Sequence, residues 1–174
     1  MTPSTEVGSH KRFEAAFDLV GSILGFGASR PDQETGIGPD NLWAIGNDRF
    51  WAIECKSEAT ADEVSREYLE QLSHSTDWFD AGYREPRFTC VPLMIHPSRT
   101  PMWDAVPRQG ARIMTFERLA TLRQAISDFT AAIRVGDAYK TPASVGANLN
   151  EFGLKSSSME DRWTQNFTKP ALRK

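Results

Sequence analysis

Residues 50–56 read Phe-Trp-Ala-Ile-Glu-Cys-Lys, and this stretch decides how the chain is expected to fold. It is rich in aromatic and branched side chains, a composition typical of a β-strand. Successive side chains on a strand point to opposite faces of the sheet. We therefore expect Glu54 and Lys56 to share one face and Ile53 and Cys55 to share the other.

The residues before this strand predict a β-hairpin. Residues 41–46 predict the first strand of the hairpin, and residues 46–49, Gly-Asn-Asp-Arg, predict its turn. Residues 36–39, Gly-Ile-Gly-Pro, give the chain a bent and constrained path into Asp40. Thirteen residues separate Asp40 from Glu54. A hairpin brings Asp40, at the start of the first strand, beside the end of the second.

This group of side chains favours chemistry at a phosphate. Two carboxylates on a rigid sheet, Asp40 and Glu54, suit a hard divalent cation such as Mg²⁺, and the backbone carbonyl of Cys55 supplies a further oxygen ligand. Lys56 is a compact cation that can orient or help deprotonate an attacking water, or neutralise charge in the transition state. The competing interpretation is a surface aspartate after a proline turn, followed by an exposed Glu/Lys alternation on an edge strand.

The pattern resembles the signature of the PD-(D/E)XK nuclease superfamily, whose fold is restriction-endonuclease-like. Pro39-Asp40 matches the first half of that signature and Glu54-Cys55-Lys56 the second, and the resemblance covers residues from about 10 to 115. It implies an α/β core with a central mixed four-stranded sheet flanked by helices in αβββαβ-type order. It also implies a Mg²⁺ cofactor, for which Mn²⁺ can substitute.

A helix is expected over residues 10–24, with an apolar stripe at helical spacing and Ser9 as its N-cap. Glu14 lies in its first turn. In many members of the superfamily an acid on this helix reaches the metal site, which makes Glu14 a candidate site residue. The other interpretation, a solvated glutamate that complements the helix dipole, stays open.

A second helix is expected after the strand, and residues 60–63, Thr-Ala-Asp-Glu, fit a capping box. Gln71 falls on its inward side, where a buried amide needs hydrogen-bond partners. Some branches of the superfamily carry a glutamine here that positions the active-site groups. RecB-like branches have a tyrosine four residues later, and the chain departs from that pattern with Ser75. His74 is a weak candidate, because a lone helical histidine is more often structural or exposed.

The rest of the chain predicts two more strands and a long helix. The strands are expected over residues 87–95, where Pro92 indicates an edge or a bulge, and over residues 111–114. Thr115 is expected to cap a helix that runs to residue 133. We divide the chain into a nuclease-like α/β domain, residues 1–135, and a C-terminal extension, residues 136–174. The extension is expected to contain a linker and short helices that pack on the domain or mediate association.

Composition bounds these expectations. The 174 residues fit one domain with a sizeable core, and the net charge of −3 does not favour nonspecific adhesion to nucleic acid. No apolar stretch is long enough to cross a membrane, and residues 1–6 lack the apolar core of a signal peptide. Cys55 and Cys90 are expected to be reduced thiols in the core. We therefore expect a cytoplasmic protein.

Together these patterns predict a Mg²⁺-dependent nuclease in which Asp40, Glu54, Lys56, Gln71 and Glu14 form the site. DNA is favoured as substrate and endonuclease action as the mode. By family analogy, such domains work in restriction, phage defence or repair, with a second copy of the chain or a helicase or other defence-system protein as partner. Two alternatives remain open: a noncatalytic nucleic-acid-binding or scaffolding module with the same fold, and a nuclease that cleaves RNA.

Overall fold

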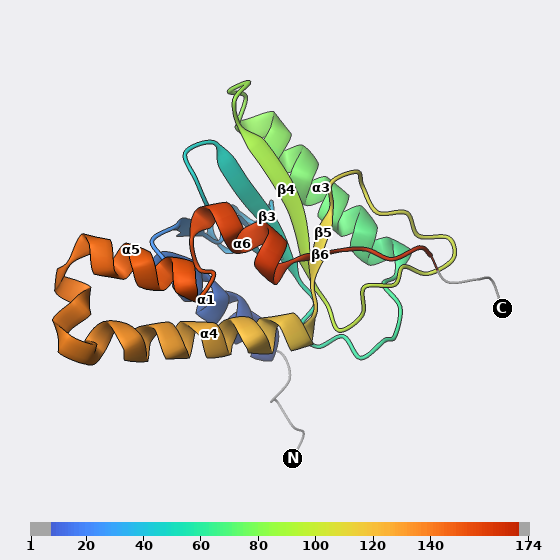
Figure 1. The fold of residues 1–174 in the computed structure, drawn as a ribbon. Helices are drawn as coiled ribbons and strands as arrows, with labels where there is room; N and C mark the ends of the chain where they lie inside the picture. Colours follow the sequence, from blue (N-terminus) through green and yellow to red (C-terminus); the bar gives the residue numbers. More distant parts are fainter. Residues whose placement is uncertain (1–7, 171–174) are drawn as a thin grey trace, which may run out of the picture.

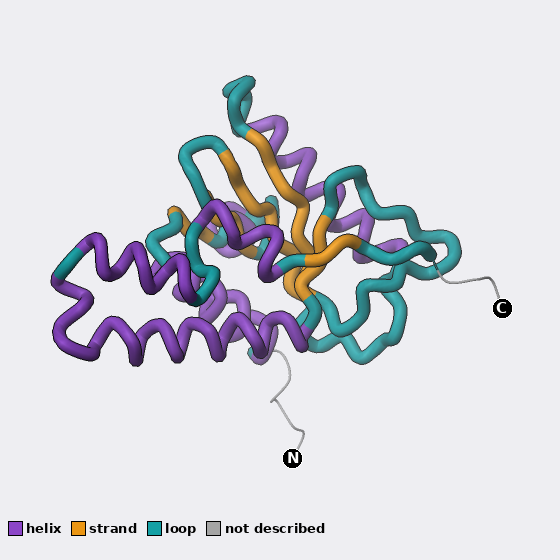
Figure 2. The backbone as a smooth tube through the Cα atoms, in the orientation of Figure 1, coloured by secondary structure: helices purple, strands orange, loops and turns teal. Residues whose placement is uncertain are grey.

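The computed structural model describes residues 8–170, which form an α/β fold around one mixed sheet with helices on both faces (Figure 1). The sheet has six strands in the order β1-β2-β3-β4-β5-β6. The β1–β2, β2–β3 and β5–β6 pairs are antiparallel, and the β3–β4 and β4–β5 pairs are parallel. Figure 2 shows the strands at the centre and the helices around them.

The elements have the following bounds. The strands are β1 Gly27–Ser29, β2 Asn41–Ala44, β3 Arg49–Cys55, β4 Thr89–Ile95, β5 Arg112–Met114 and β6 Gln165–Asn166. The helices are α1 Ser9–Ile23, α2 Pro31–Thr35, α3 Arg66–Gly82, α4 Phe116–Arg134, the 3-10 helix η1 Val135–Lys140, α5 Pro142–Glu151 and α6 Ser156–Trp163.

The prediction of a four-stranded sheet is wrong, because the sheet has six strands. The four strands expected over residues 41–46, 50–56, 87–95 and 111–114 are present as β2 to β5 with shifted ends. The two unpredicted strands, β1 and β6, have three and two residues and lie at the two edges. Their sequences, Gly-Ala-Ser and Gln-Asn, carry no alternating pattern, so only their pairing with β2 and β5 makes them strands.

Pro92 lies within β4, which is an inner strand of the sheet. Around Pro92, however, β4 pairs on one side only, so the prediction of an edge position is confirmed for this part of the strand. The other side of β4 pairs with β5 only over Leu93–Ile95. The residues of β4 before Leu93, including Pro92, therefore have β3 as a neighbour but lack a partner in β5. A missing backbone N–H is tolerated best at such a position.

Two predicted helix caps are wrong. Ser9 is the first residue of α1 and Gly8 is its N-cap. The helix predicted to start near Thr60 begins at Arg66, because Val64 is held in a bridge with Pro101 and its N–H donates to the carbonyl of Thr100 at 2.8 Å. The true cap is Ser65, whose hydroxyl accepts a hydrogen bond from the backbone N–H of Tyr68 at 3.2 Å.

β3 is buried on both faces, which separates two layers of helices. Trp51, Ile53 and Cys55 face the core that α1, α4 and α6 cover, whereas Phe50 and Ala52 face the core that α3 covers. The predicted alternation of side chains along residues 50–56 is therefore confirmed. Figure 1 shows α3 on one side of the sheet and α1, α4 and α5 on the opposite side.

α1 approaches the sheet closely at a glycine. Gly21 is buried, and a Cβ built on it would lie 2.6 Å from Cε2 of Trp43 on β2. Any side chain here would have to push α1 away from the sheet. Glu14 and Phe17 are the other buried residues of α1, and they recur with Gly21 at helical spacing.

The C-terminal segment contributes to the core of the same sheet. Leu154, Met159 and Trp163 are buried in the core that α1 and α4 cover, and β6 adds an edge strand beside β5. The indole N–H of Trp163 donates to the carbonyl of Gly153 at 2.7 Å. Residues 142–166 therefore pack on the α/β domain.

Candidate active site

The candidate site lies at the edge of the sheet where β2 begins and β3 ends. The two strands are antiparallel, with Asn41 opposite Ile53, so Asp40 is carried to the end of β3. Its Oδ2 accepts a hydrogen bond from the backbone N–H of Cys55 at 2.7 Å. The predicted hairpin therefore does bring Asp40 to the Glu54-Cys55-Lys56 segment.

The electrostatic environment of Asp40 favours its neutral form. Burial and the negative charge of Glu54 raise the pKa of the Asp40 carboxyl to about 6, against the lowering effects of the Cys55 N–H and Lys56. Oδ1 of Asp40 accepts no hydrogen bond from the residues that the structure describes. A half-buried carboxyl group, Asp40, thus lies close enough to the buried carboxylate of Glu54 for their charges to repel, an arrangement that a bound cation would relieve.

Lys56 links the strand to α3. Its ammonium donates to Oε2 of Glu54 at 3.0 Å and to Oε1 of Gln71 at 2.6 Å. The second carboxylate oxygen of Glu54, Oε1, accepts a hydrogen bond from the hydroxyl of Ser75. Glu54 is 6% exposed, so these donors satisfy a carboxylate that is almost removed from solvent.

Tyr68 forms a wall beside Lys56. The ammonium of Lys56 lies 5.2 Å from the centroid of the Tyr68 ring, within the range of a cation–π interaction. The buried His96 packs edge-on against the Tyr68 ring, with 5.9 Å between the two ring centroids. Burial lowers the pKa of His96, which keeps a second positive charge away from Lys56.

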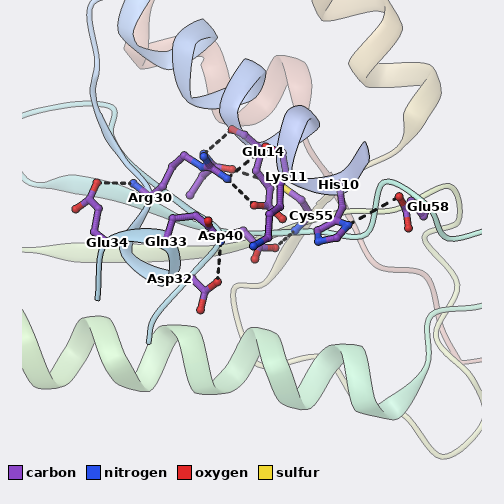
Figure 3. A network of polar contacts seen from close by, with 11 residues as sticks. His10, Lys11, Glu14, Arg30, Asp32, Gln33, Glu34, Asp40, Cys55 and Glu58 are labelled. Carbon is purple, nitrogen blue, oxygen red and sulfur yellow. Dashed lines mark hydrogen bonds and ion pairs between the residues drawn. The ribbon is translucent and has the colours of Figure 1, made fainter. Parts of the chain in front are cut away.

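Glu14 approaches the same place from α1, as Figure 3 shows. It is 5% exposed, and its Oε2 accepts a hydrogen bond from Arg30 at 2.8 Å. Its backbone carbonyl accepts from the side-chain amide of the buried Asn41 at 3.0 Å. Glu14 is therefore not the fully solvated glutamate of the second interpretation. Arg30 neutralises it, and Asn41 ties this turn of α1 to β2.

The Cys55 thiol lies on the face of β3 that packs against α1, opposite to the face that carries Glu54. Its Sγ lies 3.5 Å from Oδ1 of Asn41, and burial followed by the charges of Asp40, Glu14 and Glu54 raises the pKa of the thiol. A thiol held protonated is a poor metal ligand. The backbone N–H of residue 55 contacts Asp40, and the prediction that its carbonyl is a metal ligand stays a prediction. Cys55 and Cys90 are both free cysteines, as expected.

A cleft of about 290 Å³ opens over these residues, and its lining includes Glu14, Asp40, Lys56 and Tyr68. His10 and Glu58 lie on its rim, with 3.9 Å between Nδ1 of His10 and Oε1 of Glu58 (Figure 3). A larger hollow of about 460 Å³ lies between α1 and α4, but its lining is apolar except for Arg123. The cleft is the better candidate for chemistry because it gathers acids and a lysine.

The residues of the cleft fit a magnesium ion in part. Residues 8–170 contain no group of three or more His, Cys, Asp and Glu side chains arranged to hold a metal. Asp40 lines the cleft and supplies one carboxylate, Glu54 is near enough to repel it electrostatically and supplies a second, and the backbone N–H of Cys55 donates to Asp40. Mg²⁺ keeps several waters and often takes only one or two protein carboxylates, with substrate phosphate completing its coordination. The donor set therefore suits Mg²⁺ better than a metal that needs an all-protein cage.

The structure brings together most of the residues that the sequence singled out. Asp40, Glu54, Lys56 and Gln71 form one connected group, and Glu14 lies beside them on the cleft wall. His74 is exposed on α3 and takes no part. Sequence reasoning assigned no site role to Ser75, Tyr68 or Asn41. The available signal was the spacing of positions 68, 71 and 75, which places three polar side chains on one face of a helix.

Comparison of the chain with protein-family models, with curated proteins and with solved structures found no match. The geometry of the cleft is therefore the basis from which a function is inferred. None of the helices within residues 8–170 combines the length and the apolar character that a membrane span requires.

Proposed function

We propose that the protein is a Mg²⁺-dependent nuclease that hydrolyses phosphodiester bonds, with DNA as the favoured substrate. The observation that carries the proposal is the hydrogen-bonded group at the end of β3. Lys56 there contacts Glu54 and Gln71, and Asp40 lies beside Glu54 with its pKa raised to about 6. A carboxyl group with a raised pKa, next to a lysine in a cleft, marks a candidate active site.

The roles follow from the chemistry of each group. Asp40, Glu54 and the carbonyl of Cys55 would hold Mg²⁺, which when bound polarises a phosphate and makes water a stronger nucleophile. Lys56 lines the same cleft, where its positive charge can orient the attacking water or stabilise the added negative charge of the transition state. Gln71 and Tyr68 restrict the Lys56 ammonium to this place.

The order of the elements supports the proposal. α1 is followed by β1, by the one-turn helix α2, and by β2 and β3, and these three strands pair antiparallel; α3 and then β4, which is parallel to β3, come next. Apart from α2, this sequence of elements is compatible with the αβββαβ-type order that the resemblance to the PD-(D/E)XK superfamily implies. A role in restriction, phage defence or repair, with a second copy of the chain or a helicase as partner, belongs to the same proposal and rests on family analogy.

Cleavage assays test the proposal directly. The purified protein is incubated with supercoiled duplex DNA, circular single-stranded DNA and RNA, each with Mg²⁺, Mn²⁺ or a chelator. We expect metal-dependent cutting of a DNA circle, which an obligate exonuclease cannot perform. We expect Asp40→Asn and Lys56→Ala to remove the activity, with Lys155→Ala, an exposed lysine on α6's N-cap, as the matched control.

Three results would change the assignment. Full activity in both Asp40→Asn and Lys56→Ala would contradict the proposed mechanism. Cutting of RNA alone would move the substrate from DNA to RNA. Inactivity on every substrate, together with no binding of Mn²⁺ by calorimetry, would favour the noncatalytic nucleic-acid-binding or scaffolding module.

A further inference from the structure

α3 contains three hydroxyl side chains within four residues, and they behave differently. Ser73 donates to the carbonyl of Leu69 at 2.9 Å, and Thr76 donates to the carbonyl of Leu72 at 2.9 Å. Both bond back to the residue four positions earlier, which is the usual arrangement for a hydroxyl inside a helix. Ser75 lies between them, and its hydroxyl leaves the helix to donate to Oε1 of Glu54 on β3.

Ser75 is also buried, with 4% of its surface exposed. A buried serine among Leu72, Thr76 and Phe79 contributes little to apolar packing compared with a larger residue. Its position follows Gln71 by one turn, on the face of α3 that reaches Glu54 and Lys56. The Ser75 hydroxyl therefore donates to a side chain of the candidate site and not to a carbonyl of its own helix.

The two oxygens of Glu54 are held by donors from two different elements. Oε2 accepts from Lys56 at the end of β3, and Oε1 accepts from Ser75 on α3. A glutamate side chain has several rotatable bonds, and opposed hydrogen bonds at its two oxygens leave it one orientation. Without the hydroxyl, Oε1 would be buried without a partner, and the carboxylate would be free to turn both oxygens toward Lys56.

We infer that Ser75 is a positioning residue for Glu54, which holds the carboxylate in the orientation that binds the divalent cation. This inference rests on the proposed nuclease function. Loss of an outer residue that hydrogen-bonds a metal-ligating carboxylate typically lowers metal affinity by about 10- to 100-fold. The role of Ser75 is exerted through Glu54 and requires no contact with substrate.

The test is a calorimetric titration of metal-free protein with Mn²⁺. We expect Ser75→Ala to weaken Mn²⁺ binding by about 10- to 100-fold and Ser75→Thr, which keeps the hydroxyl, to restore most of the affinity. Ser73→Ala is the matched control, because it removes a hydroxyl from the same helix without touching Glu54. In cleavage assays, Ser75→Ala should raise the Mg²⁺ concentration needed for half-maximal rate more than it lowers the rate at saturating Mg²⁺.

A second measurement does not depend on metal. The unfolding free energies of Ser75→Ala, Glu54→Gln and the double variant should be nonadditive in chelator, because the two side chains share a hydrogen bond. Wild-type affinity for Mn²⁺ in Ser75→Ala, in a protein that cleaves DNA, would overturn the inference and leave the proposed function standing. Absence of both Mn²⁺ binding and cleavage in the wild type would overturn the proposed function, and this inference with it.

Discussion

At the scale of single residues, Asp40 is where burial, a like charge and hydrogen bonding act on one carboxyl group. Burial and Glu54 raise its pKa to about 6, whereas the Cys55 N–H and Lys56 oppose the rise. The fold therefore holds a carboxylate that is less stable when ionised than the same group in an unfolded chain. A bound cation would stabilise the ionised carboxylate and so remove this unfavourable contribution to the free energy of the folded state.

Asp40→Asn is expected to stabilise the metal-free protein above pH 6. The folded pKa of about 6 exceeds the ordinary value of 3.8, so wild-type stability rises as the pH falls from above 6 toward 3.8. The neutral amide escapes this penalty, and we expect the variant to gain roughly 2 kcal/mol at pH 8. The gain should vanish below pH 4. Urea denaturation in chelator across this pH range measures both quantities.

The control for this prediction is Asp62→Asn, which neutralises an exposed aspartate in the loop before α3. Its effect on the free energy of unfolding should stay within about 0.5 kcal/mol at every pH. A destabilised Asp40→Asn at pH 8 would show that the ionised carboxylate contributes to folding and would contradict the argument.

Metal affinity should depend on pH through the same group. Because Asp40 must lose its proton to act as a ligand, a pKa of about 6 makes protons compete with Mg²⁺ or Mn²⁺ in the acid range. We expect the apparent affinity for Mn²⁺ to be constant above pH 7 and to fall by about tenfold per pH unit well below pH 6. Calorimetry in matched buffers checks this, and affinity unchanged at pH 5 would exclude Asp40 as a ligand.

The sequence could predict Asp40, Glu54 and Lys56 because strand alternation and a hairpin place them by simple geometry. Gln71 could be predicted from helical spacing, which places it on the inward side of the helix, where a buried amide requires a hydrogen-bond partner. The contact of Ser75 with Glu54 could not be predicted, because it depends on the separation of α3 from β3 and on one side-chain rotamer. The pairing of Arg30 with Glu14 likewise joins residues 16 positions apart, one within α1 and the other just after β1, and depends on how α1 packs against the sheet.

At the scale of the elements, the start of α3 controls how the helix presents Tyr68, Gln71 and Ser75. The helix begins one residue after Ser65, and Val64 is fixed by its bridge to Pro101. Two fixed points in succession set the rotation of α3 about its axis. The sequence pattern at residues 60–63 resembled a capping box, yet the extended backbone at Val64 prevents a helix from starting there.

Ser65→Ala should therefore destabilise the protein by about 1 kcal/mol, the usual cost of losing an N-cap side chain. Thr60→Ala should leave the free energy of unfolding nearly unchanged, because Thr60 is exposed and precedes the helix by more than a turn. Urea denaturation of the two variants separates these expectations. Equal losses in both would mean that the helix extends back to Thr60.

At the scale of the whole molecule, one sheet unites segments from both ends of the described chain. β1 forms one edge and β6, more than 130 residues later, forms the other. The sequence predicted the α/β class and the four inner strands because these strands carry apolar patterns. It could not predict the two edge strands. Each consists of two or three small or polar residues, which are extended because they pair with the adjacent strand of the sheet.

The contribution of the C-terminal segment to the core can be measured at Trp163. This side chain is 2% exposed and hydrogen-bonded to Gly153, so Trp163→Ala should cost about 3–5 kcal/mol in the free energy of unfolding. Tyr139→Ala, an aromatic truncation at a residue that is 53% exposed in η1, should cost less than about 1 kcal/mol. A small loss at Trp163 would mean that residues 142–166 fold as an appendage to the sheet.

The glycine at which α1 meets Trp43 has a consequence for the evolution and engineering of the cleft. Gly21 lies two helical turns from Glu14, on the same buried side of α1, and a side chain there would collide with Trp43. Any larger residue would lift or tilt the whole helix and carry the carboxylate of Glu14 away from Asp40. In a library randomised over α1 and selected for cleavage, position 21 should therefore tolerate as little variation as position 14, although it bears no functional group.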